Sequence, residues 1–191
     1  MLVLGVGGFS SGVGKTALIC NLVSVLPGWG VLKTSPGEPP LRLITDPDEL
    51  LRHGSDTARY QESGARRVAR LRCSLPEMEA GVALAMESFS GLPGVLVEGN
   101  SFARYLEPSR MILVARVGLD EVKSSARDRI PTAHWIVLNR ERGSDPGLAS
   151  KRVKQLAGEF NLGRIVVLDA SSSEEPGTAA FLQEVRTWAR R

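Results

Sequence analysis

Short apolar runs alternate with longer segments of helical periodicity along most of this chain. Most of the short runs are apolar throughout, which is typical of parallel strands that helices cover on both faces. Six such runs predict strands, at residues 2–6, 30–33, 94–98, 111–115, 135–139 and 165–169. Because strands and helices alternate, the pattern predicts an α/β fold: a doubly wound, mainly parallel sheet with helices on both faces.

Capping and turn residues indicate where the helices begin and end. The first helix is expected from Lys15 to about Leu26, because Pro27 and Gly28 follow. Asp46 precedes Pro47, a pairing typical of an N-cap followed by the first helical residue. Further helices are expected from the capping box at residues 74–77 to about Ser88, from Asp145-Pro146 to about Phe160, and from near Thr178.

Two segments are harder to assign. Residues 56–64 look helical, whereas residues 69–73 alternate apolar side chains with Arg70 and Arg72, so a strand is possible there. Residues 35–40 are rich in proline and glycine, and we expect a mobile loop. Since the chain shows no repeat and no linker, residues 1–191 predict a single nucleotide-binding domain.

The strongest chemical signal follows the first predicted strand. Residues 8–16 are Gly-Phe-Ser-Ser-Gly-Val-Gly-Lys-Thr, which predicts a phosphate-binding loop between a strand and a helix. Glycines let the backbone curl so that its N–H groups point at an anion, and the helix N-terminus adds to their field. We expect Lys15 to reach the β- and γ-phosphates and the Thr16 hydroxyl to bind Mg²⁺. The predicted nucleotide-binding residues are Ser10, Ser11, Gly12, Val13, Gly14, Lys15, Thr16 and Ala17.

The spacing of this loop is unusual. The common pattern has four residues between its first glycine and the Gly-Lys pair, but here the first glycine is Gly8 and five residues intervene. The alternative is a glycine-rich turn that binds nothing. Strand, turn, Lys-Thr and apolar helix follow one another in the required order, which favours the phosphate loop.

Hydrolysis or transfer of a phosphoryl group also needs groups outside the loop. Glu98 ends the strand predicted at residues 94–98, and ligand groups gather at the carboxyl ends of such strands. Asp56 is the second candidate carboxylate, with a helix N-cap as the alternative. Lys33 closes another predicted strand in a chain that otherwise prefers arginine, so we expect a compact positive charge to be needed there; chance placement is the alternative.

The residue that would contact the nucleobase is Asn139, at the end of a predicted strand. A guanine-reading loop would be Asn-Lys-x-Asp, but the fourth position here is Arg142. Asn139 is therefore predicted to contact a purine edge, with adenine and guanine both open, and a strand-end cap is the alternative. Residues 170–172 are a weaker candidate for flanking the base.

Composition narrows the possible classes of partner. With 42% apolar and 24% charged residues the chain should be globular. The net charge is +3 and no basic run exceeds two residues, so nucleic acid is not an expected partner. Cys20 and Cys73 form no metal-binding pair, which fits a reducing cytoplasm. No membrane span and no signal peptide are expected, because no apolar stretch approaches 18 residues.

Together these positions resemble a group of P-loop NTPases that contains dethiobiotin synthetase, the cobyrinic acid amidases and the molybdopterin-guanine dinucleotide biosynthesis protein MobB. The loop spacing at residues 8–16 is similar to the first two, and residues 97–99, Val-Glu-Gly, follow in the expected order. Residues 56–65 resemble the D-x-x-R-x-x-x-x-G-A stretch of MobB. The resemblance implies a homodimer, Mg²⁺ with GTP or ATP, catalytic roles for Lys15, Lys33 and Glu98, and metal-binding roles for Thr16, Asp56 and Glu98.

Three functions stay open at this point. The first is a MobB-like accessory protein that binds and slowly hydrolyses GTP or ATP and serves a cofactor-assembly protein partner in the cytoplasm. The second is an ATP-dependent ligase or kinase of the dethiobiotin synthetase type, in which Lys15, Lys33 and Mg²⁺ neutralise developing charge. The third is a nucleotide-gated binding module without useful catalysis. We favour the first because of residues 56–65 and the short chain.

Overall fold

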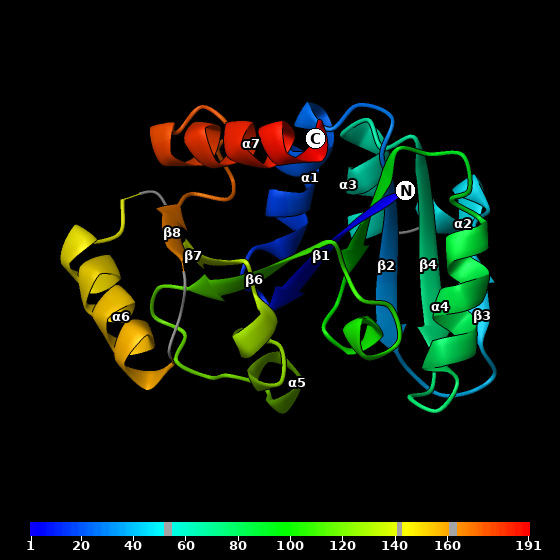
Figure 1. The fold of residues 1–191 in the computed structure, drawn as a ribbon, viewed down its shortest axis with the longest axis horizontal. Coiled ribbons are helices and arrows are strands. Elements are labelled where there is room, and N and C mark those ends of the chain that lie inside the picture. The colour runs from blue at the N-terminus through cyan, green and yellow to red at the C-terminus, as the bar shows by residue number, and fades with distance from the viewer. Residues whose placement is uncertain (52–54, 141–142, 161–163) are drawn as a thin grey trace.

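The fold is seen in a computed structural model, which describes residues 1–51, 55–140, 143–160 and 164–191. Its centre is an eight-stranded sheet in the order β3-β4-β2-β5-β1-β6-β7-β8 (Figure 1). The strands are β1 (Leu2–Gly8), β2 (Gly30–Pro36), β3 (Arg42–Ile44), β4 (Arg67–Cys73), β5 (Gly94–Glu98), β6 (Arg110–Arg116), β7 (Trp135–Asn139) and β8 (Ile165–Leu168). All neighbouring strands are parallel except β3, which pairs antiparallel with β4. The predicted α/β fold class is thereby confirmed.

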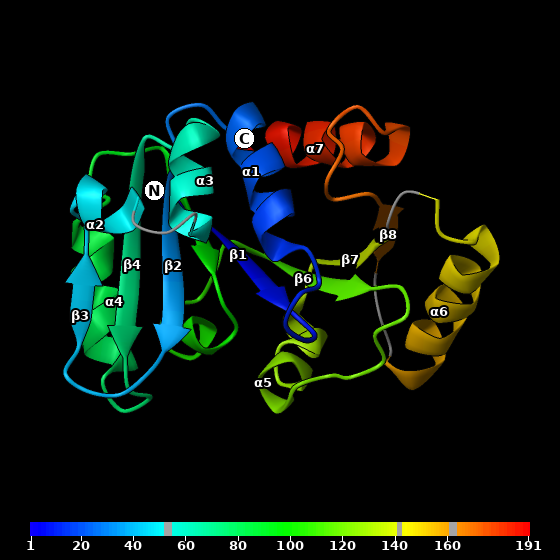
Figure 2. The same ribbon diagram turned by 180° about the vertical axis from the view of Figure 1, so that it is seen from behind.

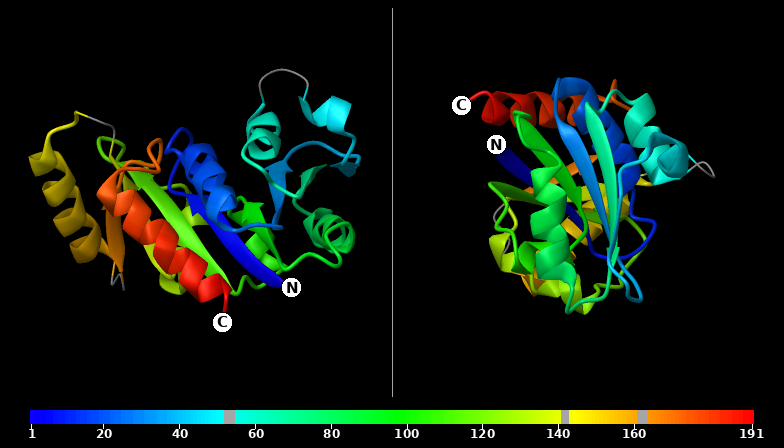
Figure 3. Two further views of the ribbon diagram at one scale, coloured as in Figure 1. Left: turned by 90° about the horizontal axis from the view of Figure 1, so that it is seen from above. Right: turned by 90° about the vertical axis from the view of Figure 1, so that its right-hand side faces the viewer.

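Helices cover both faces of this sheet (Figures 2 and 3). Helices α1, α2, α3 and α7 contribute to the apolar cluster on one face, and α4, α5 and α6 to the cluster on the other. The right-hand view of Figure 3 shows α4 and α3 on opposite sides of the strands. The helices are α1 (Lys15–Val25), α2 (Pro47–Leu51), α3 (Asp56–Glu62), α4 (Met78–Glu87), α5 (Ser124–Arg127), α6 (Pro146–Glu159) and α7 (Pro176–Ala189), with 3₁₀ turns η1 (Ser101–Arg104) and η2 (Ile130–Thr132).

Successive side chains of a strand point to opposite faces of the sheet. Because helices cover both faces, consecutive residues of a strand are apolar. In β2, Val31 packs into the apolar cluster to which α1 contributes (the α1 cluster), and Leu32 packs into the one to which α4 contributes (the α4 cluster). Two residues beyond Val31, towards the carboxyl end of the strand, the same face carries Lys33. β5 repeats this pattern, with Leu96 in the α1 cluster and Glu98 two residues further on. The α1 face of the sheet therefore changes from apolar to charged at its carboxyl edge.

The predicted helix starts at Asp46 and Asp145 are correct. The Asp46 carboxylate accepts hydrogen bonds from the backbone N–H groups of Asp48 at 2.8 Å and Glu49 at 3.2 Å. Asp145 caps α6 in the same way, by accepting a hydrogen bond from the N–H of Gly147 at 2.8 Å. Both helices begin with the proline that follows the cap.

The structure corrects three other boundaries. Ser35 and Pro36 belong to β2, so the strand extends into the segment predicted as a mobile loop. The Glu77 carboxylate accepts the hydrogen bond from the N–H of Ser74 that a capping box predicts, but the Ser74 hydroxyl also donates to this carboxylate; residues 75–77 form a turn, and α4 starts only at Met78. The last helix starts two residues before Thr178, with the Glu175 side chain as its N-cap.

The antiparallel strand β3 was not predicted, because three residues are too few to show a pattern. The uncertain segment 69–73 is strand, as part of β4. Among the helices in the described ranges, none combines the length and the apolar character that crossing a bilayer would require.

Candidate functional site

The phosphate loop joins the carboxyl end of β1 to the amino end of α1. Gly12 has φ 69° and Gly14 has φ 98°, a left-handed backbone conformation that residues other than glycine rarely adopt. A Cβ at residue 14 would also overlap the amide of Asn139. The local geometry therefore requires glycine at both positions that the sequence predicted to shape the loop.

The ammonium of Lys15 folds back over the start of this loop. Its Nζ lies 3.2 Å from the place that a Cβ on Gly8 would occupy. Burial lowers the pKa of Lys15, and the neighbouring cations Lys33 and Lys123 lower it further, while the Glu98 carboxylate acts in the opposite direction. Three cations, Lys15, Lys33 and Lys123, thus converge here on two carboxylates, Glu98 and Asp56, which leaves an excess of positive charge that suits a polyanionic ligand.

Lys33, Asp56 and Glu98, which lie far apart along the chain, meet beside this loop. The Lys33 ammonium pairs with the Asp56 carboxylate and lies 3.3 Å from Oε2 of Glu98. Lys33 and Glu98 are register partners on the adjacent parallel strands β2 and β5, so their side chains point to the same face. The structure therefore brings the two predicted carboxylates and the second predicted lysine into one cluster.

Tyr60 belongs to this cluster, although sequence reasoning missed it. It is fully buried in α3, and its hydroxyl donates a hydrogen bond of 2.7 Å to Oε2 of Glu98. Burial and the Glu98 carboxylate both raise the pKa of Tyr60, so the phenol keeps its proton. Lys33 and Tyr60 together hold Glu98 Oε2 from two sides. A tyrosine one turn into a predicted helix carries no signal that separates it from an ordinary core aromatic.

Thr16 and Asp56 provide the oxygen atoms that suit Mg²⁺. The Thr16 hydroxyl donates a hydrogen bond of 2.9 Å to Oδ1 of Asp56, so the two side chains meet at the start of α1. Hydroxyl and carboxylate oxygens are the hard ligands that Mg²⁺ prefers. Asp56 does not cap its helix as the alternative held, because Ser55 is the N-cap and accepts a hydrogen bond from the N–H of Ala58. The Asp56 carboxylate is therefore directed at Thr16 and Lys33 and not at the backbone of its own helix.

The ion pair of Asp56 predicts a loss of stability in acid. Burial alone would raise the pKa of Asp56, but hydrogen bonds from Lys33 and Thr16 outweigh it and hold the pKa below its ordinary value of 3.8. The stabilisation is therefore complete above pH 3.8 and is lost as the pH falls through the lower folded-state pKa. We expect the unfolding temperature of Asp56→Asn to depend less steeply on pH below 4 than that of the unmodified protein. Parallel acid-melting curves would contradict this.

Three further side chains fix the loop, and the motif did not reveal them. Lys123 Nζ donates a hydrogen bond of 2.9 Å to the Ser11 hydroxyl, and Arg116 donates one of 3.1 Å to the carbonyl of Gly12. The amide of Asn100 exchanges two hydrogen bonds of 3.0 Å with the backbone of Gly8. They come from segments after β5 and β6, which the topology places on either side of β1.

Asn139 lies beside the loop, and its amide already has partners. Its Nδ2 donates to the carbonyl of Val13 at 3.0 Å, and its Oδ1 accepts from the N–H of Ala170 at 2.9 Å. These bonds tie the phosphate loop to the segment after β8. A cavity of about 470 Å³ next to it is lined in part by Arg140, Ser144 and Asp169. A contact of Asn139 with a base stays a prediction, and Arg142 lies outside the described residues.

A central β1, a mostly parallel sheet and a phosphate loop leading into α1 together define the fold of the P-loop NTPases. The chain is similar to the hydrogenase maturation factor HypB from Archaeoglobus fulgidus, with TM-score 0.66, 15% identity, and coverage of 99% of this chain and 90% of that one.

Two other solved structures show the same likeness. HypB from Helicobacter pylori, in complex with nickel, has TM-score 0.59 and 13% identity over 100% of this chain and 87% of that one. The cell division protein MinD from Aquifex aeolicus has TM-score 0.60 and 12% identity over 100% and 98%. No family model and no curated protein sequence matches the chain. At these identities the likeness establishes the fold.

Proposed function

We propose that this protein binds a magnesium complex of GTP or ATP and hydrolyses it slowly. The observation that carries the proposal is the convergence of Lys15, Lys33 and Lys123 on a loop whose glycines have the required geometry. The loop amides and Lys15 would hold the phosphates. Thr16 and Asp56 would hold Mg²⁺, which neutralises phosphate charge when bound.

Slow intrinsic hydrolysis follows from the state of Glu98. A general base must lie within hydrogen-bonding reach of the water it activates and must be free to accept the proton. Oε2 of Glu98 instead accepts a hydrogen bond from Tyr60 and faces Lys33 at 3.3 Å. We propose that a protein partner accelerates turnover by rearranging this cluster, as expected for a MobB-like accessory protein in cofactor assembly. The resemblance of residues 56–65 to MobB supports that role.

The test is a thermal-shift comparison of ATP and GTP with and without Mg²⁺. A nucleotide at 100 times its dissociation constant stabilises the folded state by about 2.7 kcal/mol, which raises the unfolding temperature of a chain this long by roughly 5 to 10 °C. We expect one base to give the larger shift, and Mg²⁺ to increase it in the unmodified protein but not in Asp56→Asn. The absence of any shift with both nucleotides at millimolar concentration would overturn the proposal.

A further inference from the structure

A row of charged side chains crosses the α1 face of the sheet next to the phosphate loop. Glu98, Lys33 and Arg70 are register partners on β5, β2 and β4, so all three point to the same side. We call these three residues the charged row. Lys33 pairs with both Glu98 and Asp56, and Arg70 adds a second positive charge beside it on the neighbouring strand. The two cations match the two carboxylates in number, but among the described residues only Lys33 forms ion pairs with them. A buried strand face would ordinarily carry an apolar residue at that position.

Arg70 has no acidic partner among the residues that the structure describes. In the described parts of the chain no carboxylate forms an ion pair with Arg70 or with Arg72. The nearby acid Glu49 pairs instead with Arg42, at 3.0 Å. The Nε of Arg70 is buried and has no hydrogen-bond partner among the described residues. Buried polar groups are ordinarily satisfied, so an unpartnered guanidinium nitrogen indicates a missing acceptor.

Two cavities meet at Arg70. One of about 250 Å³ is lined by Lys33, Asp56 and Arg70 together with Ser55 and Thr57. A second, of about 200 Å³, shares Ser55, Thr57 and Arg70 and is also lined by Arg72 and by Glu49, whose carboxylate pairs with Arg42. The hydroxyls of Ser55 and Thr57 are hydrogen-bonded to the carbonyl of Leu50, at 2.7 and 2.8 Å. The donors left for a ligand in these cavities are therefore the guanidinium groups.

We propose that the cavity lined by Lys33, Asp56 and Arg70 binds a small anionic co-substrate, through a carboxylate or phosphate group held by Arg70. Arg70 presents a planar set of N–H donors that matches either oxyanion, and Arg72 extends the positive charge towards solvent. The inference rests on the proposed function, because the other wall of the cavity is formed by Lys33 and Asp56, which lie beside the site proposed for the nucleotide. A ligand here would have its anionic group next to the γ-phosphate end of that nucleotide.

The experiment is a calorimetric titration of inorganic phosphate and, separately, of succinate into the protein saturated with Mg²⁺ and a non-hydrolysable triphosphate analogue. Loading the phosphate loop first ensures that the anion does not simply replace the nucleotide phosphates. We expect one of the two anions to bind the loaded protein, and Arg70→Gln to weaken that binding at least about 10-fold. Nucleotide affinity should change by less than about twofold.

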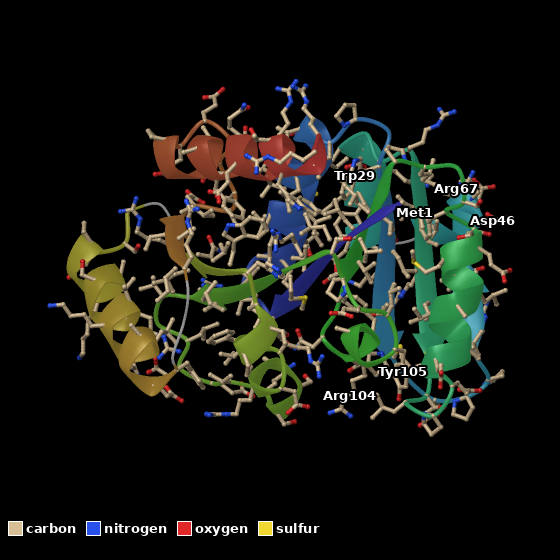
Figure 4. The ribbon with its side chains drawn as sticks, viewed as in Figure 1. Met1, Trp29, Asp46, Arg67, Arg104 and Tyr105 are labelled. Carbon is tan, nitrogen blue, oxygen red and sulfur yellow. The ribbon has the colours of Figure 1, made fainter. Side chains whose placement is uncertain are left out.

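Arg67→Gln is the matched control. Arg67 lies on the same strand but is exposed at its amino end, three residues from Arg70 (Figure 4). We expect this variant to bind the anion as the unmodified protein does. Binding of neither anion, or equal effects of the two substitutions, would overturn the proposal. If Arg70→Gln does not fold, as judged by circular dichroism, Arg70→Lys is tested in its place. Lysine keeps the positive charge but lacks the planar set of N–H donors, so the same weakening is expected.

Failure of the proposed function would be seen separately, as a lack of nucleotide binding by every variant. The anion titration is then repeated with Lys15→Ala, which removes the ammonium that would attract an anion to the phosphate loop. Anion binding to Lys15→Ala that disappears on adding Arg70→Gln would uphold the pocket. Its absence would overturn the pocket as well.

Discussion

Replacing Lys15 with alanine is expected to reduce nucleotide turnover, measured as kcat/KM, by about 100- to 1000-fold, the usual cost of removing one preorganised electrostatic contact. The ammonium lies over the start of the phosphate loop, where it would neutralise phosphate oxygens directly. Burial and the neighbouring cations lower the pKa of Lys15, which means that they disfavour its charged form. An anion bound beside the ammonium would favour the charged form. Phosphate release under steady-state conditions measures the effect.

The control for this experiment is Lys154→Ala. Lys154 is exposed on α6 and lies on the other face of the sheet from the loop helix. We expect its turnover and its affinity for nucleotide to match those of the unmodified protein. A Lys15→Ala protein that retains more than a tenth of the original kcat/KM would show that the loop does not act on the nucleotide phosphates.

Replacing Lys33 with alanine is expected to reduce the free energy of unfolding at pH 7 by about 3 kcal/mol, as when one partner of a buried ion pair is removed. Glu98 is only 6% exposed and would keep Tyr60 as its sole hydrogen-bonding partner in the cluster. Asp56 would lose its partner as well, although it is partly solvated and contributes less. Urea unfolding monitored by circular dichroism measures the loss.

A double-mutant cycle separates charge from packing in this cluster. Adding Glu98→Gln to Lys33→Ala removes the unpaired carboxylate while keeping a hydrogen-bond acceptor for Tyr60. The double variant is therefore expected to be more stable than Lys33→Ala alone, by about 1 to 2 kcal/mol. If the second substitution lowers stability further by its full independent amount, Lys33 and Glu98 are not coupled and the cluster is wrongly described.

The sheet could be predicted from sequence because its six longer apolar runs have no competing interpretation. The strand β4 was ambiguous because arginines occupy alternate positions, and Arg70 proves to be part of the charged row. The strand β3 was not predicted because three residues are too few to show a periodic pattern, and because the residues it pairs with, Arg70 to Arg72, are distant in the sequence. The start of α4 was misplaced because the Ser74 hydroxyl donates a hydrogen bond to the Glu77 carboxylate, and no side chain caps the helix that begins at Met78.

The candidate site could be predicted where a short stretch of sequence by itself indicates the role of a residue. The phosphate loop is one contiguous motif, so its residues could be assigned together. Glu98 and Lys33 were found because each is a charge at the end of an apolar strand, and Asp56 because it resembles a known stretch. Tyr60, Lys123 and Arg70 were missed because their roles depend on register and on crossing connections that bring distant segments together.

The short strands at the two borders of the sheet limit how molecules of this protein associate. β3 has three residues and β8 has four, so each border offers few unpaired backbone N–H and C=O groups to a strand from another molecule. Continuous intermolecular β-pairing is therefore disfavoured. A dimer, if one forms, would be built from helices and loops, and its subunits could separate without breaking any strand ladder.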